Sequence, residues 1–195
     1  HASLSRRLDR TTIGDPQHEG VRMGALVSRS QVEEVGRRLD ELSAHTEVVY
    51  GDVATYDVLG GDPEKGAFFH PVLLLNDDPF NKHVSHTVEA FGPVSTITPY
   101  TTLDEAVELA NMGKGSLVST VATADPEIAT HYVMGSAPFH GRILILNEES
   151  AKESTGHGSP MPLLVHGGPG RAGGGQEMGG VRGVKHYLQT TAVQG

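Results

Sequence analysis

The sequence has 195 residues, the length of one ordinary domain. It carries 15 Lys and Arg against 24 Asp and Glu, a net charge of −9 without any basic run, which argues against a nucleic-acid partner. It contains no Cys, which excludes disulfides, thiolate metal sites and a cysteine nucleophile within these residues. No apolar run approaches the roughly 18 residues that span a bilayer, so we expect no membrane partner, and a cytoplasmic compartment fits this composition.

The amino-terminal third predicts one amphipathic helix and two strands. Ser30-x-x-Glu33 resembles a capping box, and it is followed by apolar residues at helical spacing, namely Val32, Val35, Leu39 and Leu42. Residues 48–50 are β-branched and aromatic, which favours a short strand. Residues 67–75 are apolar and extended, and Pro71 within them indicates an edge strand or a bulge.

Strand and helix signals alternate through the middle of the chain. Strands are expected at residues 94–100, 117–123 and 142–146, and helices open at the capping box Thr102-x-x-Glu105 and at Asp125-Pro126. Parallel strands need such helical crossovers. The fold class predicted is therefore α/β, an open parallel sheet with helices on both faces.

Glycine is concentrated near the carboxyl end, where 11 of the 25 glycines fall between Gly156 and Gly183. A strand signal follows at residues 187–193, so we interpret the glycine-rich stretch as an ordered loop. Within it, residues 168–173 match the letters G-x-G-x-x-G. A dinucleotide site of that type needs a preceding strand, a following helix and a later acid, all of which are lacking here, so the match is rejected.

Two clusters of polar residues have both a chemical and a structural interpretation. His83-x-x-His86-x-x-Glu89 would place three metal-ligand types on one helix face, but Gly92-Pro93 ends any helix at once, and no metal is predicted. Glu148, Glu149 and Glu153 follow a predicted strand, where acid–base carboxylates and a solvated acidic loop are equally consistent with the sequence.

Six segments in order resemble motifs of the aldehyde dehydrogenase superfamily. The most characteristic is 89–94 (EAFGPV), which resembles E-x-F-G-P-V. The others are 14–16 (GDP), 20–27 (GVRMGALV), 67–74 (AFFHPVLL), 102–111 (TLDEAVELAN) and 141–147 (GRILILN). Residues 147–160 and 166–177 depart from the common family pattern and resemble the aldehyde dehydrogenase domain of bacterial phenylacetate-degradation bifunctional proteins, which oxidise a CoA-linked semialdehyde.

The resemblance implies a catalytic domain of the aldehyde dehydrogenase type that is only partly present. In this family a cysteine thiolate attacks the aldehyde, hydride passes to NAD or NADP, and a glutamate base activates water. The resemblance implies that the cysteine, the base and the cofactor domain lie upstream of His1. We therefore expect residues 1–185 to be a partial catalytic domain that has no catalytic residue of its own and is inactive alone, and residues 186–195 to form an oligomerisation strand.

The resemblance also assigns site residues. Glu89 matches the glutamate that binds the nicotinamide-ribose hydroxyls, and Phe91 matches the aromatic beside it, with a core residue as the alternative interpretation of Phe91. Ser150, Lys152 and Met161 match substrate-tunnel positions, where polar side chains would suit a CoA-linked aldehyde.

The carboxy-terminal strand implies a homo-oligomer, because residues 187–193 match the strand that joins a neighbouring subunit's sheet. The alternative is that this strand pairs within its own domain. Two other functional interpretations remain open at this point: a non-catalytic α/β module for binding or assembly, and a relative of the acyl-phosphate reductases.

Overall fold

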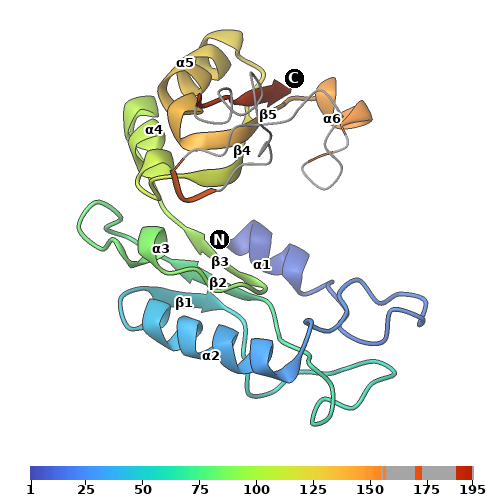
Figure 1. Cartoon of the computed structure of the whole chain (residues 1–195). Helices are drawn as coiled ribbons and strands as arrows, with labels where there is room; N and C mark the ends of the chain where they lie inside the picture. Colours follow the sequence, from blue (N-terminus) through green and yellow to red (C-terminus); the bar gives the residue numbers. More distant parts are fainter. Residues whose placement is uncertain (155, 157–169, 173–187, 195) are drawn as a thin grey trace, which may run out of the picture. The chain divides into compact units, whose positions relative to one another are not determined.

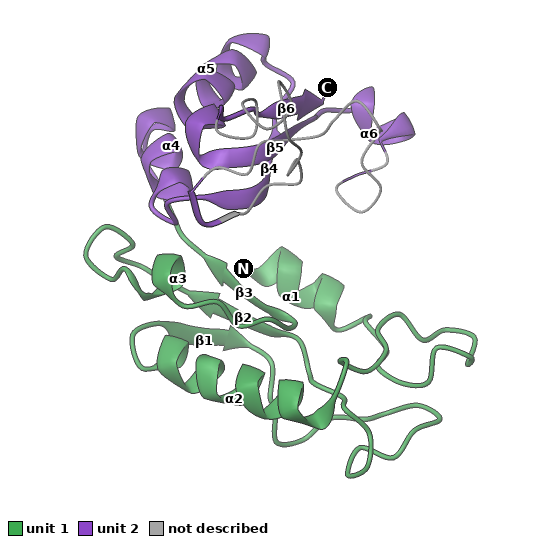
Figure 2. Ribbon diagram, viewed as in Figure 1, with its two compact units in different colours: residues 1–99 green, residues 100–195 purple. Residues whose placement is uncertain are grey.

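The structure, a computed structural model, describes residues 1–154, 156, 170–172 and 188–194. The chain forms two compact units, His1–Pro99 and Tyr100–Gly195 (Figure 2). The predicted boundary between a partial catalytic domain (residues 1–185) and an oligomerisation strand (residues 186–195) is a different one from the boundary at Pro99, and it stays a prediction. Along the described ranges, no helix is both long enough and apolar enough to cross a lipid bilayer.

A three-stranded sheet forms the centre of the first unit, in the order β1-β2-β3 (Figure 1). Strand β1 is antiparallel to β2, and β2 is parallel to β3, with Val72 opposite Val94. The unit contains β1 (Glu47–Tyr50), β2 (Val72–Leu75), β3 (Val94–Ile97), α1 (Ala2–Leu8), α2 (Arg29–Ser43) and α3 (Val84–Thr87). The strand expected at 48–50 is thus confirmed, and the strand expected at 94–100 is present but ends at Ile97.

Helix α2 packs on this sheet through one apolar face, as the sequence pattern predicts. Its N-cap is Ser28, whose hydroxyl accepts a hydrogen bond from the backbone N–H of Gln31. The expected cap at Ser30 is wrong, because Ser30 already lies in the first turn, where its hydroxyl is 2.8 Å from that of Ser28. The core contains Val35, Leu39 and Leu42 of α2 together with Phe69, Val72 and Leu74.

Strand β2 is the central strand of this sheet, so the expectation of an edge strand around Pro71 is wrong. Pro71 lies one residue before the strand begins and therefore removes no donor from the ladder. The first ladder donor is Val72, whose N–H bonds the carbonyl of Pro93 at 2.9 Å. The register irregularity in this sheet lies in β1, between Val48 and Tyr50.

The second unit contains a parallel sheet in the order β4-β5-β6. Its described elements are β4 (Ser116–Ala122), β5 (His140–Leu146), β6 (Ala192–Gln194), α4 (Leu103–Asn111), α5 (Pro126–Ser136), α6 (Ser150–Glu153), η1 (Ala137–Phe139) and η2 (Gly170–Ala172). Buried side chains of β4, α5 and β5, namely Val121, Tyr132 and Ile143, form the core against which α4 packs through Val107 and Ala110.

Both helices that were expected here begin at the predicted caps. Thr102 and Glu105 form a reciprocal capping box at the start of α4. Asp125 caps α5, accepting hydrogen bonds from the backbone N–H groups of Glu127 and Ile128, and Pro126 occupies the first helical position. Local side-chain chemistry therefore fixes where these two helices start.

The α/β class with parallel strands and packed helices is confirmed, but the strands do not share one sheet. Strand β3 pairs with β2, whereas β4 pairs with β5. The expected continuous sheet through residues 94–146 is therefore wrong. Helix α4 joins β3 to β4 in sequence without making them neighbours, because strand pairing is decided by long-range packing and not by the local pattern.

The carboxy-terminal strand is shorter than expected. Strand β6 covers Ala192–Gln194 and pairs in parallel with β5, with Arg142 opposite Ala192. Just before it, the hydroxyl of Thr191 donates to the carbonyl of His140 at 2.8 Å. Tyr187 lies outside the described residues. Pairing within one chain is the alternative stated above, and pairing between subunits stays a proposal.

Candidate functional site

Residues 88–93, here named the 88–93 loop, connect α3 to β3 and present two predicted site residues on one side. Val88, the residue that follows α3, is extended, with φ of −107° and ψ of 123°, and the chain bends at residues 91–93. Burial alternates along the loop: Val88 and Ala90 pack against the core, whereas Glu89 and Phe91 are exposed. Phe91 is 73% exposed, so its interpretation as a core residue is wrong.

The tip of this loop is held against α2. The side-chain Nε2 of Gln31 donates a 2.8 Å hydrogen bond to the carbonyl oxygen of Phe91. Gly92 lies so close to α2 that a Cβ there would be 2.7 Å from Cγ2 of Val35. The backbone folds tightly around this point, since the N–H of Gly92 bonds the carbonyl of Ala90 at 2.7 Å. Glycine is therefore needed at 92 for the loop and helix to approach.

The exposed side of the 88–93 loop offers a carboxylate beside an aromatic ring. The two oxygens of Glu89 can accept hydrogen bonds from two neighbouring hydroxyl groups. The ring of Phe91, two residues away and also exposed, can cover an apolar or flat group. This pair suits a ligand that carries a vicinal diol next to a planar ring.

The histidines that precede Glu89 do not share a helix face with it. Helix α3 ends at Thr87, so Glu89 follows in extended chain. Burial, and after it the nearby His83, lower the pKa of His86 below its ordinary value. Among the residues that the structure describes, no group of three or more His, Asp and Glu side chains is placed to hold a metal ion.

In the second unit, the turn after β5 uses the hydroxyl of one predicted substrate residue. Asn147 accepts hydrogen bonds through Oδ1 from the backbone N–H groups of Glu149 and Ser150, at 3.0 and 2.9 Å. The hydroxyl of Ser150 donates to the carbonyl of Ile145 at 3.0 Å. Lys152 is exposed and pairs with Glu149 at 2.9 Å. Met161 lies outside the described residues.

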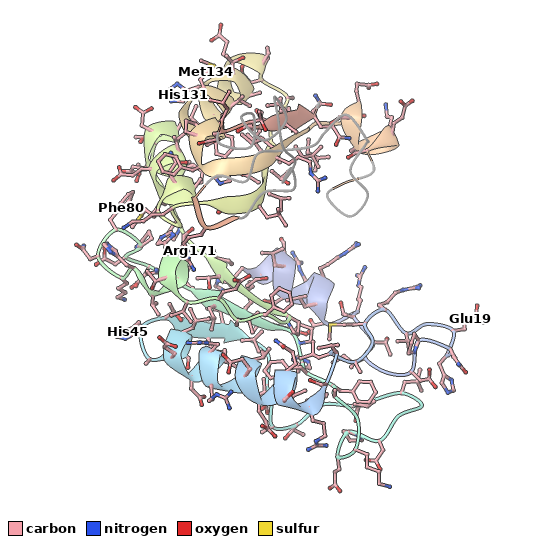
Figure 3. All side chains as sticks on the ribbon, in the orientation of Figure 1. Glu19, His45, Phe80, His131, Met134 and Arg171 are labelled. Atoms are coloured by element: carbon pink, nitrogen blue, oxygen red, sulfur yellow. The ribbon has the colours of Figure 1, made fainter. Side chains whose placement is uncertain are left out.

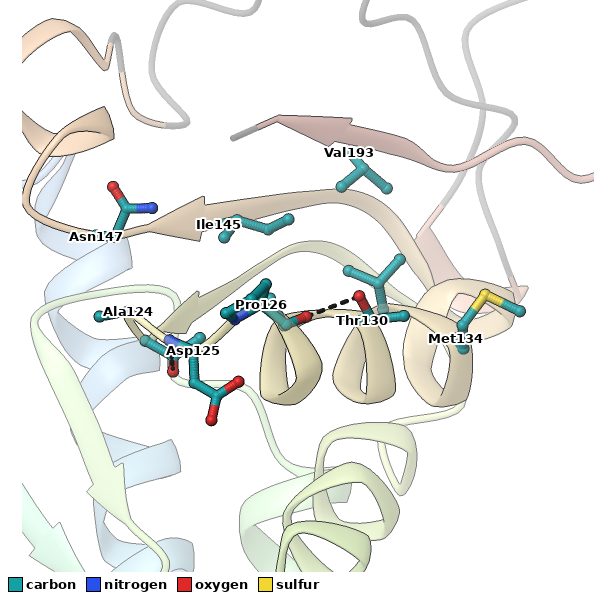
Figure 4. A pocket seen from close by; sticks show the side chains of 11 residues that line it. Ala124, Asp125, Pro126, Thr130, Met134, Ile145, Asn147 and Val193 are labelled. Carbon is teal, nitrogen blue, oxygen red and sulfur yellow. Dashed lines mark hydrogen bonds between the residues drawn. The ribbon is translucent and has the colours of Figure 1, made fainter.

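A cavity of about 350 Å³ lies at the carboxyl ends of β4 and β5, beside α5 (Figure 4). Its polar side chains are already engaged locally: Asp125 caps α5, Asn147 accepts hydrogen bonds from the N–H groups of Glu149 and Ser150, and the hydroxyl of Thr130 donates to the carbonyl of Pro126 at 2.7 Å. The remaining lining is mostly apolar, including Met134, which Figure 3 labels on α5. The cavity therefore offers apolar surface and little free hydrogen-bonding capacity.

A comparison with models of known protein families shows which family the chain belongs to. The model described as the aldehyde dehydrogenase family matches residues 1–193. The chain belongs to the aldehyde dehydrogenase family. The resemblance carried by 89–94 and the other five segments is confirmed, as is membership of an oxidoreductase family.

Two curated relatives of this aldehyde dehydrogenase chain are longer than it is. Protein MaoC from Klebsiella aerogenes is 51% identical over 174 residues, which cover 89% of this chain and 50% of that protein. The 3,4-dehydroadipyl-CoA semialdehyde dehydrogenase from Aromatoleum evansii is 37% identical over 167 residues, which cover 86% of this chain and 32% of that protein. The chain thus spans half or less of the length of these relatives.

A solved aldehyde dehydrogenase shares the fold. The betaine aldehyde dehydrogenase from Staphylococcus aureus, solved in complex with NAD⁺, superposes with a TM-score of 0.63 at 24% sequence identity. The match covers 74% of this chain and 27% of that one. At this identity the likeness establishes the fold of the aldehyde dehydrogenase catalytic domain.

Sequence reasoning missed Gln31 as a residue that supports the loop carrying Glu89 and Phe91. The available signal was Ser28-x-x-Gln31, a helix N-terminus pattern in which Gln occupies the third helical position. That pattern indicates where helix α2 begins. It gives no sign that the amide reaches a carbonyl 60 residues further along the chain.

Proposed function

We propose that this chain is the carboxy-terminal part of the catalytic domain of an NAD(P)-dependent aldehyde dehydrogenase, which oxidises an aldehyde to a carboxylic acid. The observation that carries the proposal is the joint exposure of Glu89 and Phe91 on one side of a loop that is anchored to the core from its other side. Membership of the aldehyde dehydrogenase family supports it.

In this proposal the 88–93 loop holds the coenzyme at its nicotinamide ribose. Glu89 accepts hydrogen bonds from the two ribose hydroxyls, and Phe91 packs beside the ribose and shields it from water. The bound nicotinamide coenzyme supplies the hydride acceptor. The NAD⁺ complex of the betaine aldehyde dehydrogenase with the same fold supports NAD or NADP as the cofactor.

The covalent chemistry requires polypeptide outside these residues. The chain contains no Cys, whereas the family's reaction needs a thiolate nucleophile. We therefore propose that the nucleophile and its glutamate base are contributed by an upstream segment of a longer enzyme, and that these 195 residues alone are inactive.

The substrate class proposed is a CoA-linked semialdehyde from aromatic catabolism, with phenylacetate degradation as its setting. Support comes from the name of the 37% identical relative, a CoA-semialdehyde dehydrogenase. Lys152 belongs to the substrate assignment through the family resemblance; its side chain is 59% exposed, and its ammonium group pairs with Glu149 at 2.9 Å. Ser150 and Met161 belong to the same substrate assignment, although the hydroxyl of Ser150 already serves the turn.

The test is a comparison of substrates with the full-length enzyme that contains these residues. A CoA-linked semialdehyde and benzaldehyde are each assayed with NAD⁺ and with NADP⁺. The proposal predicts a higher kcat/KM for the CoA-linked aldehyde and no turnover by the 195-residue chain alone. A higher kcat/KM for benzaldehyde would contradict the substrate assignment, and no oxidation of any aldehyde would contradict the enzyme assignment.

We further propose that the enzyme is a homo-oligomer in which residues 187–193 join a neighbouring subunit's sheet, in place of the pairing of β6 with β5 within one chain. Light scattering of the full-length enzyme with and without residues 188–195 tests this. The proposal predicts smaller assemblies after truncation, and an unchanged mass would contradict it. A cytoplasmic location stays a prediction.

A further inference from the structure

Asn76 is a fully buried polar residue at the carboxyl end of β2. Its side chain is 0% exposed, and its backbone N–H continues the sheet by donating to the carbonyl of Ile97 at 2.9 Å. A buried amide side chain is costly unless its donors and acceptor are engaged. Asn76 therefore requires partners, and they lie on one segment of the chain.

The partners of the Asn76 side chain lie within residues 78–85, the segment that leads into and begins α3. Its Nδ2 donates to the carbonyl of Lys82 at 2.8 Å and to the hydroxyl of Ser85 at 3.0 Å. Its Oδ1 accepts from the N–H of Asp78 at 3.3 Å. Lys82 lies two residues before α3 and Ser85 lies within its first turn. The side chain thus fixes the position at which this short helix begins.

The start of α3 determines which side of the 88–93 loop faces outward. The helix is only four residues long, and the N–H of Val88 bonds the carbonyl of Val84 at 2.9 Å where the chain becomes extended. Along an extended chain, a slip of one residue exchanges the two sides. Such a slip would turn Glu89 toward the core and Val88 toward solvent. A four-residue helix has little stability of its own to resist this.

We propose that Asn76 is a positioning residue for the coenzyme: by fixing the start of α3 it sets the register in which the 88–93 loop presents Glu89 and Phe91. This inference rests on the proposed coenzyme role of that loop. Asn76 itself is buried and acts through α3 and the loop.

The experiment measures the KM of the coenzyme and of the aldehyde separately, in the full-length enzyme. Asn76→Asp keeps the size of the side chain but replaces the Nδ2 donor with a carboxylate oxygen facing the carbonyl of Lys82. We expect its coenzyme KM to rise about fivefold, the equivalent of one buried hydrogen bond, with the aldehyde KM unchanged. Ser85→Ala removes only one acceptor and should raise the coenzyme KM about twofold.

A matched control is Asn81→Asp, the same substitution in the same segment. Asn81 is exposed, and its amide bonds Asp78 at 2.8 Å within the turn. We expect this variant to retain the parent's coenzyme KM. If Asn76→Asp does not fold, Ser85→Ala tests the positioning role instead. Ser85→Ala removes only the acceptor at residue 85 and leaves the hydrogen bond from Asn76 to the carbonyl of Lys82 in place.

Two results would overturn the inference. One is an unchanged coenzyme KM in folded Asn76→Asp or, where that variant does not fold, in Ser85→Ala. The other is a lower melting temperature with equal changes in both KM values, which a purely structural role produces.

Glu89→Gln, assayed in parallel, separates the positioning role of Asn76 from the proposed coenzyme role of the 88–93 loop. If Glu89→Gln raises the coenzyme KM and the Asn76 variant does not, only the positioning role fails. If Glu89→Gln has no effect, the coenzyme role of the loop fails.

Discussion

The side-chain amide of Gln31, in the first turn of α2, donates a 2.8 Å hydrogen bond to the carbonyl oxygen of Phe91, 60 residues further along the chain. Four residues after Gln31, Val35 is fully buried beneath Gly92. One helix therefore holds the tip of the 88–93 loop by a polar contact and a steric one, while Glu89 and Phe91 remain exposed.

Gln31→Met should weaken coenzyme binding without affecting the aldehyde. The substitution preserves the length of the side chain but removes the donor to Phe91, so the tip of the loop loses one tether. We expect the coenzyme KM of the full-length enzyme to rise about two- to fivefold, within the range of one hydrogen bond. Glu33→Met, at an exposed position on the same helix, is the control. Equal coenzyme KM values for the two variants would refute the tether.

Gly92→Ala should destabilise the chain because its new Cβ would lie 2.7 Å from Val35. Overpacking of this kind costs about 1–3 kcal/mol of unfolding free energy. The matched control is Gly36→Ala on α2, where a Cβ meets nothing within 4 Å. Because alanine favours the helix, the control should stabilise by roughly 0.5–1 kcal/mol. Urea unfolding of the two variants should thus give opposite signs, and a neutral Gly92→Ala would show that the contact can relax.

The capping box of α4 should make stability depend on pH in the acid range. Hydrogen bonds from the N–H of Thr101, and next from that of Thr102, lower the pKa of Glu105 below its ordinary 4.5. A lowered carboxyl pKa stabilises the fold above the unfolded-state value, and the contribution is lost as pH falls through the folded-state pKa. Between about pH 6 and pH 3, the melting temperature of Glu105→Gln should therefore fall by less than that of the parent protein. Glu108→Gln, exposed on the same helix, is the comparison; identical profiles for both variants would rule out this cap as the source.

The sequence predicts those elements whose determinants are local. Thr102 with Glu105, and Asp125 with Pro126, mark the starts of α4 and α5 because a cap needs only residues within one turn. The pairing of β3 with β2 was not predictable in this way, because it depends on which apolar strands meet after the chain has folded back.

The same distinction between local and long-range determinants applies to the candidate site. The motif at 89–94 identified Glu89 and Phe91, and the alternation of buried and exposed residues explains why both face outward. The supports of the loop could not be found from the sequence. Gln31 and Asn76 are ordinary amides in the printed sequence, and only the fold shows that one contacts Phe91 and the other contacts Ser85.

The central claim is that the carboxylate of Glu89 binds the ribose hydroxyls of a nicotinamide coenzyme. Steady-state kinetics of Glu89→Gln in the full-length enzyme, with Glu33→Gln as the control, tests it most directly. Loss of a charged acceptor should raise the coenzyme KM or lower kcat by about tenfold while the aldehyde KM stays the same. A coenzyme KM and a kcat both equal to those of the control would contradict the claim.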